Sequence, residues 1–209
     1  MIDLNRPRLQ RYCQTREESV LQNLLDVLGE VTPYVVDLGA GDGRALSNSQ
    51  LLIEERGWQA CRIDGDCRGA AGTDPTLHEH RIFASNISDL LRLYSVPKSP
   101  ALLCIDLDSI DFYVLHEALL QIDPTIVVFE INGARPPKSL DVVVYDENLR
   151  WQGDDYYGAS WGAYEWLLAK HGYTCVHHHD SLNGYAVRAD VAAGKLSACG
   201  PSPQRMYHK

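Results

Sequence analysis

The sequence lacks a long apolar stretch and a paired cysteine motif. No run approaches the ~20 apolar residues that a membrane-spanning helix needs, and the first residues show no apolar core of a signal peptide. None of the six cysteines belongs to a Cys-x-x-Cys pair. We therefore expect a cytoplasmic protein with reduced, mostly buried cysteines, no membrane partner and no zinc site.

The sequence also lacks an excess of basic residues. Asp and Glu number 28 against 19 Lys and Arg, which gives a formal net charge of −9. Binding to nucleic acid depends on Lys and Arg that neutralise phosphates, so we expect no nucleic-acid partner. The negative net charge does not exclude a small anionic substrate, because a local basic pocket can exist within an acidic surface. With 209 residues, 45% of them hydrophobic, we expect one globular domain over 1–209.

Apolar runs that are typical of strands alternate with segments of helical periodicity. A helix is predicted over 15–29, with Thr15 and Glu18 as a capping box. The remaining pattern predicts strands at 34–38, 58–63, 81–83, 101–105 and 125–129, helices at 46–56, 88–94, 112–122 and 160–171, and a closing hairpin of 173–177 and 184–188. This alternation predicts a parallel α/β sheet with ligands at the carboxyl ends of its strands. We expect a loose tail over 190–209.

The most informative motif is the turn that follows the strand at 34–38. Asp37 ends an apolar run, and Gly39, Gly41 and Gly43 follow at every second position. Glycines let the backbone approach a ligand where a Cβ atom would clash. A dinucleotide-binding turn would have a small residue where Arg44 stands, and Asp37 would repel a pyrophosphate but suit a cofactor with an ammonium group. A plain strand–turn–helix junction is the alternative.

Polar residues at the ends of the next two predicted strands fit an adenosine cofactor. Asp64 follows the second strand and can accept hydrogen bonds from both ribose hydroxyls, with Asp66 as the competing choice. Both acids also suit an ordinary turn. Asn86 could bind the adenine edge, or it could stand in the turn before a helix that Ser88 caps.

A second cluster of acids follows the buried strand at 101–105. Crowded carboxylates raise one another's pKa or recruit a metal cation. We predict Asp106 as general base or metal ligand and as a cofactor contact, with Asp108 and Glu130 as further catalytic residues. Asp111 is expected to cap the following helix. If the strands that precede Asp106 and Glu130 are adjacent, Asn132 joins them in an oxygen site suited to Mg²⁺; a polar pocket for substrate is the alternative, so the metal is left open.

Taken in order, these segments resemble the small bacterial FkbM-like S-adenosylmethionine-dependent methyltransferases. The matching pieces are 36–43, 46–49, 57–58, 63–66, 105–113, 127–132, 157–160, 172–173 and 183–185. The resemblance implies a Rossmann-like class I methyltransferase fold, which is a mostly parallel seven-stranded sheet with a C-terminal antiparallel hairpin. It assigns a cofactor half to 34–95 and a substrate half to 101–189. Asp64 departs from the expected glutamate, and Ser109 from the expected glycine.

The functional expectation is methyl transfer from S-adenosylmethionine to a small molecule. The resemblance implies transfer that is usually to oxygen, but it names no substrate. Our hypothesis for the acceptor is a sugar or a natural-product intermediate. The competing hypothesis is a non-catalytic binding module of the same fold. The intact turn from Asp37 to Gly43 and the retained Asp64 count against that alternative. A nicotinamide-dependent oxidoreductase is disfavoured by Arg44 and by the position of Asp37.

Overall fold

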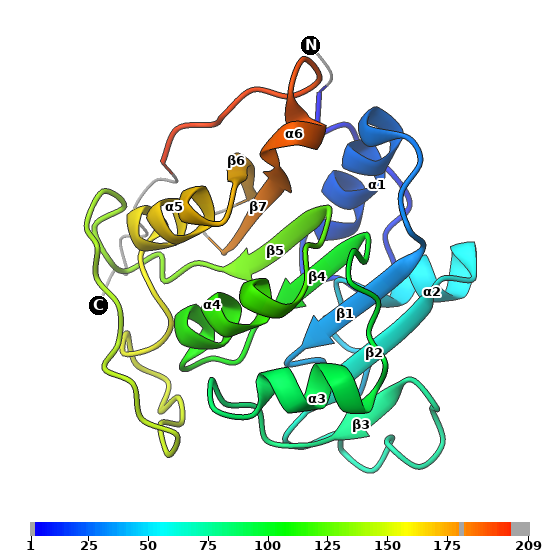
Figure 1. Cartoon of the computed structure of the whole chain (residues 1–209), viewed down its shortest axis with the longest axis vertical. Helices are drawn as coiled ribbons and strands as arrows, with labels where there is room; N and C mark the ends of the chain where they lie inside the picture. Colours follow the sequence, from blue (N-terminus) through cyan, green and yellow to red (C-terminus); the bar gives the residue numbers. More distant parts are fainter. Residues whose placement is uncertain (1–2, 180–181, 202–209) are drawn as a thin grey trace.

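A seven-stranded sheet forms the centre of the molecule. The computed structural model describes residues 3–179 and 182–201 (Figure 1). Its strand order is β3-β2-β1-β4-β5-β7-β6, and only β7 runs antiparallel to its neighbours β5 and β6. The strands are β1 Tyr34–Leu38, β2 Gln59–Asp64, β3 Leu77–Glu79, β4 Leu102–Ile105, β5 Ile126–Glu130, β6 Tyr173–His179 and β7 Asn183–Arg188. This confirms the predicted mostly parallel sheet with a C-terminal antiparallel hairpin.

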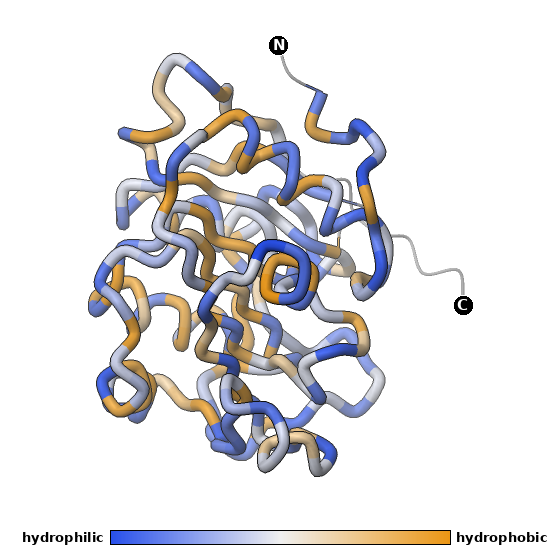
Figure 2. The backbone as a smooth tube through the Cα atoms, turned by 90° about the vertical axis from the view of Figure 1, so that its right-hand side faces the viewer, coloured by the Kyte–Doolittle hydropathy of each residue, from blue (hydrophilic) through white to orange (hydrophobic). Residues whose placement is uncertain are grey.

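Helices cover both faces of the sheet. Residues of α3 (Ile87–Leu93), α4 (Asp111–Gln121) and α5 (Trp161–Lys170) share one apolar core with Val36 of β1. Residues of α1 (Glu17–Leu28), α2 (Gln50–Arg56) and α6 (Ala189–Ala192) share the other with Val35. Neighbouring residues of a strand point to opposite faces, so β4 and β5 are buried at every position. Apolar stretches accordingly run through the middle of the molecule (Figure 2).

The predicted third strand was misplaced. Residues 81–83 are not a strand; β3 lies at Leu77–Glu79, where Leu77 pairs with Arg62 of β2. Ile82 instead packs into the core beside α3. A short apolar run is therefore compatible with a strand or with a packed loop, and the partner strand decides which forms.

The start of two helices also differs from prediction. Thr15 and Glu18 form no capping box: α1 begins at Glu17 after Arg16, and the Glu18 carboxylate accepts hydrogen bonds from the backbone of Arg11 and Tyr12. The predicted helix at 46–56 is α2 at Gln50–Arg56, because the Ser47 hydroxyl accepts the N–H groups of residues 49 and 50 and holds a turn there.

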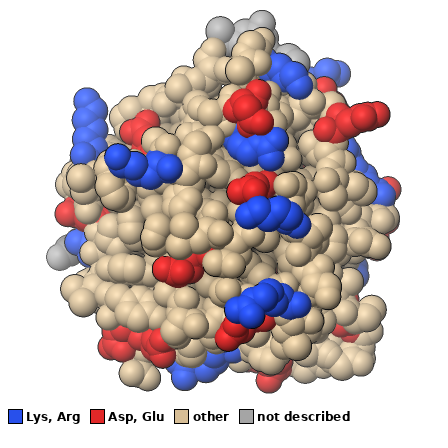
Figure 3. All heavy atoms as spheres, viewed as in Figure 1, with Lys and Arg blue, Asp and Glu red and all other residues tan. Residues whose placement is uncertain are grey.

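The chain after β7 begins with α6 and then returns to the body of the protein. The Lys195 Nζ donates to the Leu28 carbonyl over 3.0 Å, and the Cys199 N–H donates to the Cys175 carbonyl over 3.0 Å. The end of the predicted loose tail, 202–209, lies outside the described residues. No helix within the described ranges has the length and apolar character to cross a bilayer. On the face in Figure 3, acidic and basic side chains are interspersed.

Candidate functional site

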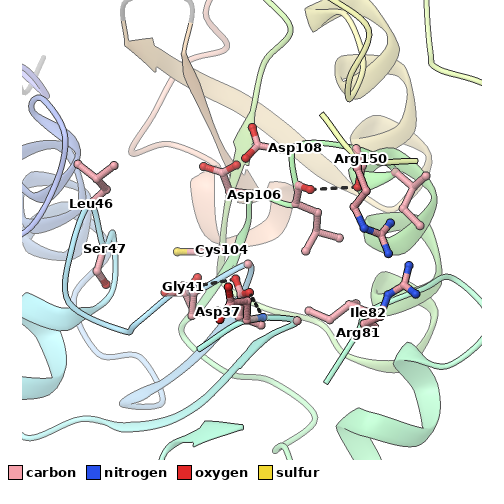
Figure 4. A pocket seen from close by; sticks show the side chains of 18 of the residues that line it. Asp37, Gly41, Leu46, Ser47, Arg81, Ile82, Cys104, Asp106, Asp108 and Arg150 are labelled. Atoms are coloured by element: carbon pink, nitrogen blue, oxygen red, sulfur yellow. Dashed lines mark hydrogen bonds between the residues drawn. The ribbon is translucent and has the colours of Figure 1, made fainter. Parts of the chain in front are cut away.

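A pocket opens at the carboxyl ends of β1, β2 and β4. Its volume is about 620 Å³, within the usual range for small-molecule sites. The chain leaves β1 towards β2 on one side and later returns to β4 on the other, and such a switch point creates a crevice at the strand ends. Six of the predicted site residues line it: Asp37, Gly39, Gly41, Asp64, Asp106 and Asp108. Figure 4 labels Asp37, Gly41, Asp106 and Asp108 among them.

The first two glycines of the turn line the pocket. Gly39 has φ 93°, and a Cβ atom there would lie 1.6 Å from the Asp106 carbonyl oxygen. Glycine therefore lets β1 and the segment after β4 come into contact. Gly41 has φ 54°, and its N–H donates to Asp64 Oδ2 over 2.8 Å. The turn and the end of β2 are joined by this bond.

Gly43 lies outside the pocket lining and faces the Arg62 side chain. A Cβ atom at Gly43 would lie 2.7 Å from Arg62 Nη1. Arg62 is buried on β2; it donates to the Gly43 carbonyl over 2.6 Å and to Gln50 Oε1 over 2.7 Å, and it forms an ion pair with Asp74. The third glycine thus accommodates a buried arginine beneath the turn.

Asp37 supplies a buried carboxylate at the end of β1. It is 6% exposed, and its Oδ2 accepts a hydrogen bond from the Ser49 hydroxyl. Burial raises the pKa of Asp37 to about 6, although the Ser49 hydrogen bond and the charge of Arg62 lower it in part. At neutral pH the carboxylate is mostly ionised and able to attract a cationic group.

Asp64 and Asp66 both line the pocket but differ in setting. Asp64 is half-buried at the end of β2 and accepts hydrogen bonds from the N–H groups of Gly41 and Asp66. Asp66 is exposed and accepts from the Arg68 N–H over 3.0 Å. Asp64 is therefore the more firmly oriented of the two acids.

Asn86 is absent from the pocket lining and serves the loop before α3. Its Oδ1 accepts from the Phe83 N–H over 2.8 Å, and its Nδ2 donates to the Arg81 carbonyl over 2.8 Å. Asn86, rather than Ser88, occupies the N-cap position of α3. The amide orients residues 81–83, of which all three line the pocket.

Asp106, Asp108 and Glu130 form a cluster of carboxylates. One oxygen of each lies within 4.8 Å of the others. Asp106 and Asp108 are exposed to the pocket, and Glu130 is buried beneath them. Surrounding protein atoms and the charges of Asp111, Asp108 and Asp37 raise the pKa of Asp106 well above its usual value, and a hydrogen bond with Glu130 lowers it in part. Burial and the charge of Asp64 also raise the pKa of Asp108.

The loop between β4 and α4 is held by Asp111. Its buried carboxylate accepts the N–H groups of Leu107 over 2.7 Å and Ser109 over 2.9 Å. Asp111 is the first residue of α4, and its side chain closes this loop instead of capping the helix as predicted. The left-handed conformation falls on Asp108, with φ 54°, so the chain turns there without a glycine at Ser109.

Asn132 is engaged elsewhere. Its Nδ2 donates to the carbonyls of Asp155 and Tyr157, and its Oδ1 accepts from the Ala134 N–H. Asp108, and not Asn132, is therefore the third residue beside Asp106 and Glu130. Mg²⁺ prefers carboxylate oxygens as ligands, so Asp106, Asp108 and Glu130 fit such an ion.

Several further residues belong to the pocket or lie close to its acids without a signal in the sequence. Arg81, Glu147 and Arg150 line the pocket from the loop after β3 and from the irregular segment before α5. Tyr164 of α5 is fully buried, and its hydroxyl has no hydrogen-bond partner among the residues that the structure describes. Burial and the charges of Asp111, Glu130 and Asp106 raise its pKa well above its usual value. Leu46 has φ 58° and lines the pocket with its side chain 65% exposed. No periodic pattern marks these positions.

Comparison with known proteins gives only distant matches. No family model matches the sequence, and no curated protein is similar to it. A candidate S-adenosylmethionine-dependent methyltransferase from Listeria monocytogenes is similar over 82% of this chain and 97% of its own, with 16% identity and a TM-score of 0.48. An O-methyltransferase family protein from Burkholderia thailandensis is similar over 82% of this chain and 56% of its own, with 10% identity and a TM-score of 0.45.

A third solved structure is an S-adenosylmethionine-dependent methyltransferase from Archaeoglobus fulgidus. It is similar over 77% of this chain and 69% of its own, with 14% identity and a TM-score of 0.46. This chain spans little more than half of the Burkholderia protein. At these identities and TM-scores the matches carry no argument about activity. The FkbM-like resemblance stays a prediction, and function rests on the pocket itself.

Proposed function

We propose that this protein binds S-adenosylmethionine in the pocket and transfers its methyl group to the hydroxyl of a small molecule. The observation that carries the proposal is one pocket that Asp37, Gly39, Gly41 and Asp64 line together at the ends of β1 and β2. The ionised Asp37 suits an ammonium group, the glycines allow close backbone approach, and Asp64 suits ribose hydroxyls. A cytoplasmic location, and the lack of a nucleic-acid or membrane partner, are part of this proposal.

The bound cofactor would supply an electrophilic methyl group on a sulfonium. The protein's contribution is orientation and proton removal. Asp106 would accept the proton of the acceptor hydroxyl, so that the hydroxyl oxygen could bond to the methyl carbon while the bond from that carbon to the cofactor sulfur breaks. The raised pKa of Asp106 suits this role, because a carboxylate with a higher pKa is a stronger base. Besides the surrounding protein atoms and Asp111, the charge of Asp108 raises the pKa of Asp106, and the hydrogen bond with Glu130 lowers it.

The same three carboxylates are the proposed ligands if the transfer uses a metal. Asp106, Asp108 and Glu130 offer oxygens within 4.8 Å of one another, and Mg²⁺ prefers such donors. A bound cation would lower the pKa of the acceptor hydroxyl and replace Asp106 as the group that activates it. Transfer rates with Mg²⁺ and with a chelator separate the two arrangements.

Calorimetry with S-adenosylhomocysteine tests the proposed cofactor. We expect saturable one-to-one binding to the wild-type protein and no heat with NAD. Asp64→Asn should weaken binding at least about tenfold, because hydrogen bonds to a charged group are lost. Asp66→Asn is the matched control and should stay within about threefold. A folded wild-type protein that binds no S-adenosylhomocysteine would contradict the proposal.

A non-catalytic module would bind the cofactor but transfer no methyl group. Asp106→Asn separates this alternative from the enzyme, because the variant keeps the shape of the side chain and loses the base. Cofactor affinity that is retained together with a lost transfer rate, measured with labelled methyl groups, supports catalysis at Asp106. A transfer rate unchanged by Asp106→Asn removes its role as the base.

A further inference from the structure

Two arginine side chains lie next to each other in the pocket. Arg81 Nη2 donates to the Glu147 carbonyl oxygen over 2.9 Å, and Arg150 Nη1 donates to the same oxygen over 3.1 Å. Both residues line the pocket, on the side away from Leu46 and Ser47, and their guanidinium groups face each other (Figure 4). Two positive charges are therefore held side by side in a chain whose net charge is −9.

Neither guanidinium group has a carboxylate oxygen within 4.0 Å in the part of the chain that the structure describes, although, in addition to the hydrogen bond from Ser85, the charge of Arg81 helps to lower the pKa of the Glu147 carboxyl. Ion pairs there neutralise other arginines, among them Arg62 with Asp74 and Arg92 with Asp89. The nearby carboxylate of Glu147 is turned towards other partners, since its Oε1 accepts the hydroxyls of Ser85 over 2.7 Å and Tyr145 over 2.9 Å. Arg150 Nη1 also donates to the Leu149 carbonyl over 2.5 Å. These backbone carbonyls satisfy donors of the two arginines but do not cancel their charges.

The surroundings hold this pair in place. The Arg81 guanidinium lies 5.0 Å from the centre of the Phe83 ring, and the hydrogen bonds of Glu147 connect the segment of Arg150 to the loop of Arg81 and Ser85. Adjacent like charges repel each other. An oxyanion between them would cancel the repulsion, and the planar donor forks of arginine match phosphate and carboxylate oxygens. The pair is thus preorganised for an anion.

We propose that Arg81 and Arg150 bind an oxyanion group of the methyl acceptor. This inference rests on the proposed function. The cofactor carries a sulfonium, an ammonium and one carboxylate, and its amino-acid end is assigned to Asp37 and the glycine turn, so it brings no anion to the arginine side. The acceptor is therefore a small molecule with a phosphate, sulfate or carboxylate group. Asp106 lines the same pocket, so an acceptor held by its anion presents its hydroxyl to that base.

The test is calorimetry with glycerol 3-phosphate as the probe and glycerol as its neutral counterpart. Measurements use the full chain saturated with S-adenosylhomocysteine, at low ionic strength because salt screens such contacts. We expect the wild type to bind the phosphate and not glycerol. Arg81→Gln and Arg150→Gln should each weaken phosphate binding at least about tenfold. Arg92→Gln, on the exposed surface of α3, is the control and should change nothing.

Cofactor affinity in the same variants separates the outcomes. Unchanged S-adenosylhomocysteine binding together with lost phosphate binding supports the inference. Absence of phosphate binding to the wild type overturns the inference. A tenfold loss of S-adenosylhomocysteine affinity in Arg81→Gln, with phosphate binding unchanged, also overturns it, because the arginines would then hold the nucleoside. Phosphate binding with the expected variant pattern, but no S-adenosylhomocysteine binding, would support the oxyanion site and overturn the proposed function.

Discussion

Single residues set the closest approaches at the site. Gly39 and Gly57 both have positive φ, of 93° and 64°, yet their surroundings differ. A Cβ atom at Gly57 would meet no atom within 4 Å, whereas one at Gly39 would lie 1.6 Å from the Asp106 carbonyl oxygen. A larger residue would strain the backbone at both positions, but only at Gly39 would its Cβ atom also overlap another atom.

Replacing each glycine with alanine should separate strain from overlap. Gly57→Ala is expected to lower the free energy of unfolding by about 1–2 kcal/mol, the cost of a left-handed non-glycine residue. Gly39→Ala should lower it by at least about 3 kcal/mol, because overpacking against backbone adds to that cost. Urea denaturation of both variants measures the difference. Equal losses would show that β1 and the segment after β4 can separate freely.

At the scale of secondary-structure elements, Arg62 joins three parts of the cofactor half. From β2 it bonds to the glycine turn at Gly43, to α2 at Gln50, and to the segment before β3 through Asp74 and Thr76. Burial raises the pKa of Asp74, but hydrogen bonds from Thr76 and the charge of Arg62 outweigh it, so the net shift is downward. One buried charge thus holds the turn, α2 and β3 against β2.

Arg62→Met should therefore destabilise the fold and loosen the pocket. The variant leaves the Gly43 carbonyl and Gln50 Oε1 without their donor, at about 1–3 kcal/mol each, whereas Asp74 is partly exposed and can be solvated. Arg92→Met removes an exposed ion pair with Asp89 and should cost less than about 1 kcal/mol. Denaturant unfolding gives both values, and hydrogen exchange of the turn after β1 should rise only in Arg62→Met. A loss below 1 kcal/mol in Arg62→Met would contradict the role of Arg62 as the central link.

At the scale of the whole molecule, the acids of the site lower the free energy of unfolding as the pH rises. Burial raises the pKa of Asp37 and Asp111, and surrounding protein atoms together with neighbouring carboxylates raise the pKa of Asp106 and Asp108. When the folded pKa exceeds the unfolded pKa, the folded state binds more protons, so stability falls as pH rises between the two values. For Asp37 this window runs from the unfolded value near ~3.9 to about 6.

Asp37→Asn should remove this component of the pH dependence. Each pH unit between the folded and unfolded pKa corresponds to about 1.4 kcal/mol, so Asp37 makes the wild type about 3 kcal/mol less stable at pH 7.5 than at pH 4. Unfolding free energies of the two proteins should be most similar near pH 4, diverge between pH 4 and pH 6 and stay apart above pH 6, with the variant the more stable. The exposed Asp89→Asn is the control. A difference in unfolding free energy that stays constant over this pH range would show that folding does not raise the pKa of Asp37.

The sequence by itself determined the alternation of strands and helices, the glycine turn and the acids at the carboxyl ends of β1, β2 and β4. These features depend on periodicity and turn chemistry among neighbouring residues, so they can be read locally. Only the tertiary structure decided that β3 lies at Leu77–Glu79, that Gly43 faces Arg62, and that Arg81 and Arg150 share one carbonyl. Those outcomes depend on which distant segments pack together, and no local pattern records that choice.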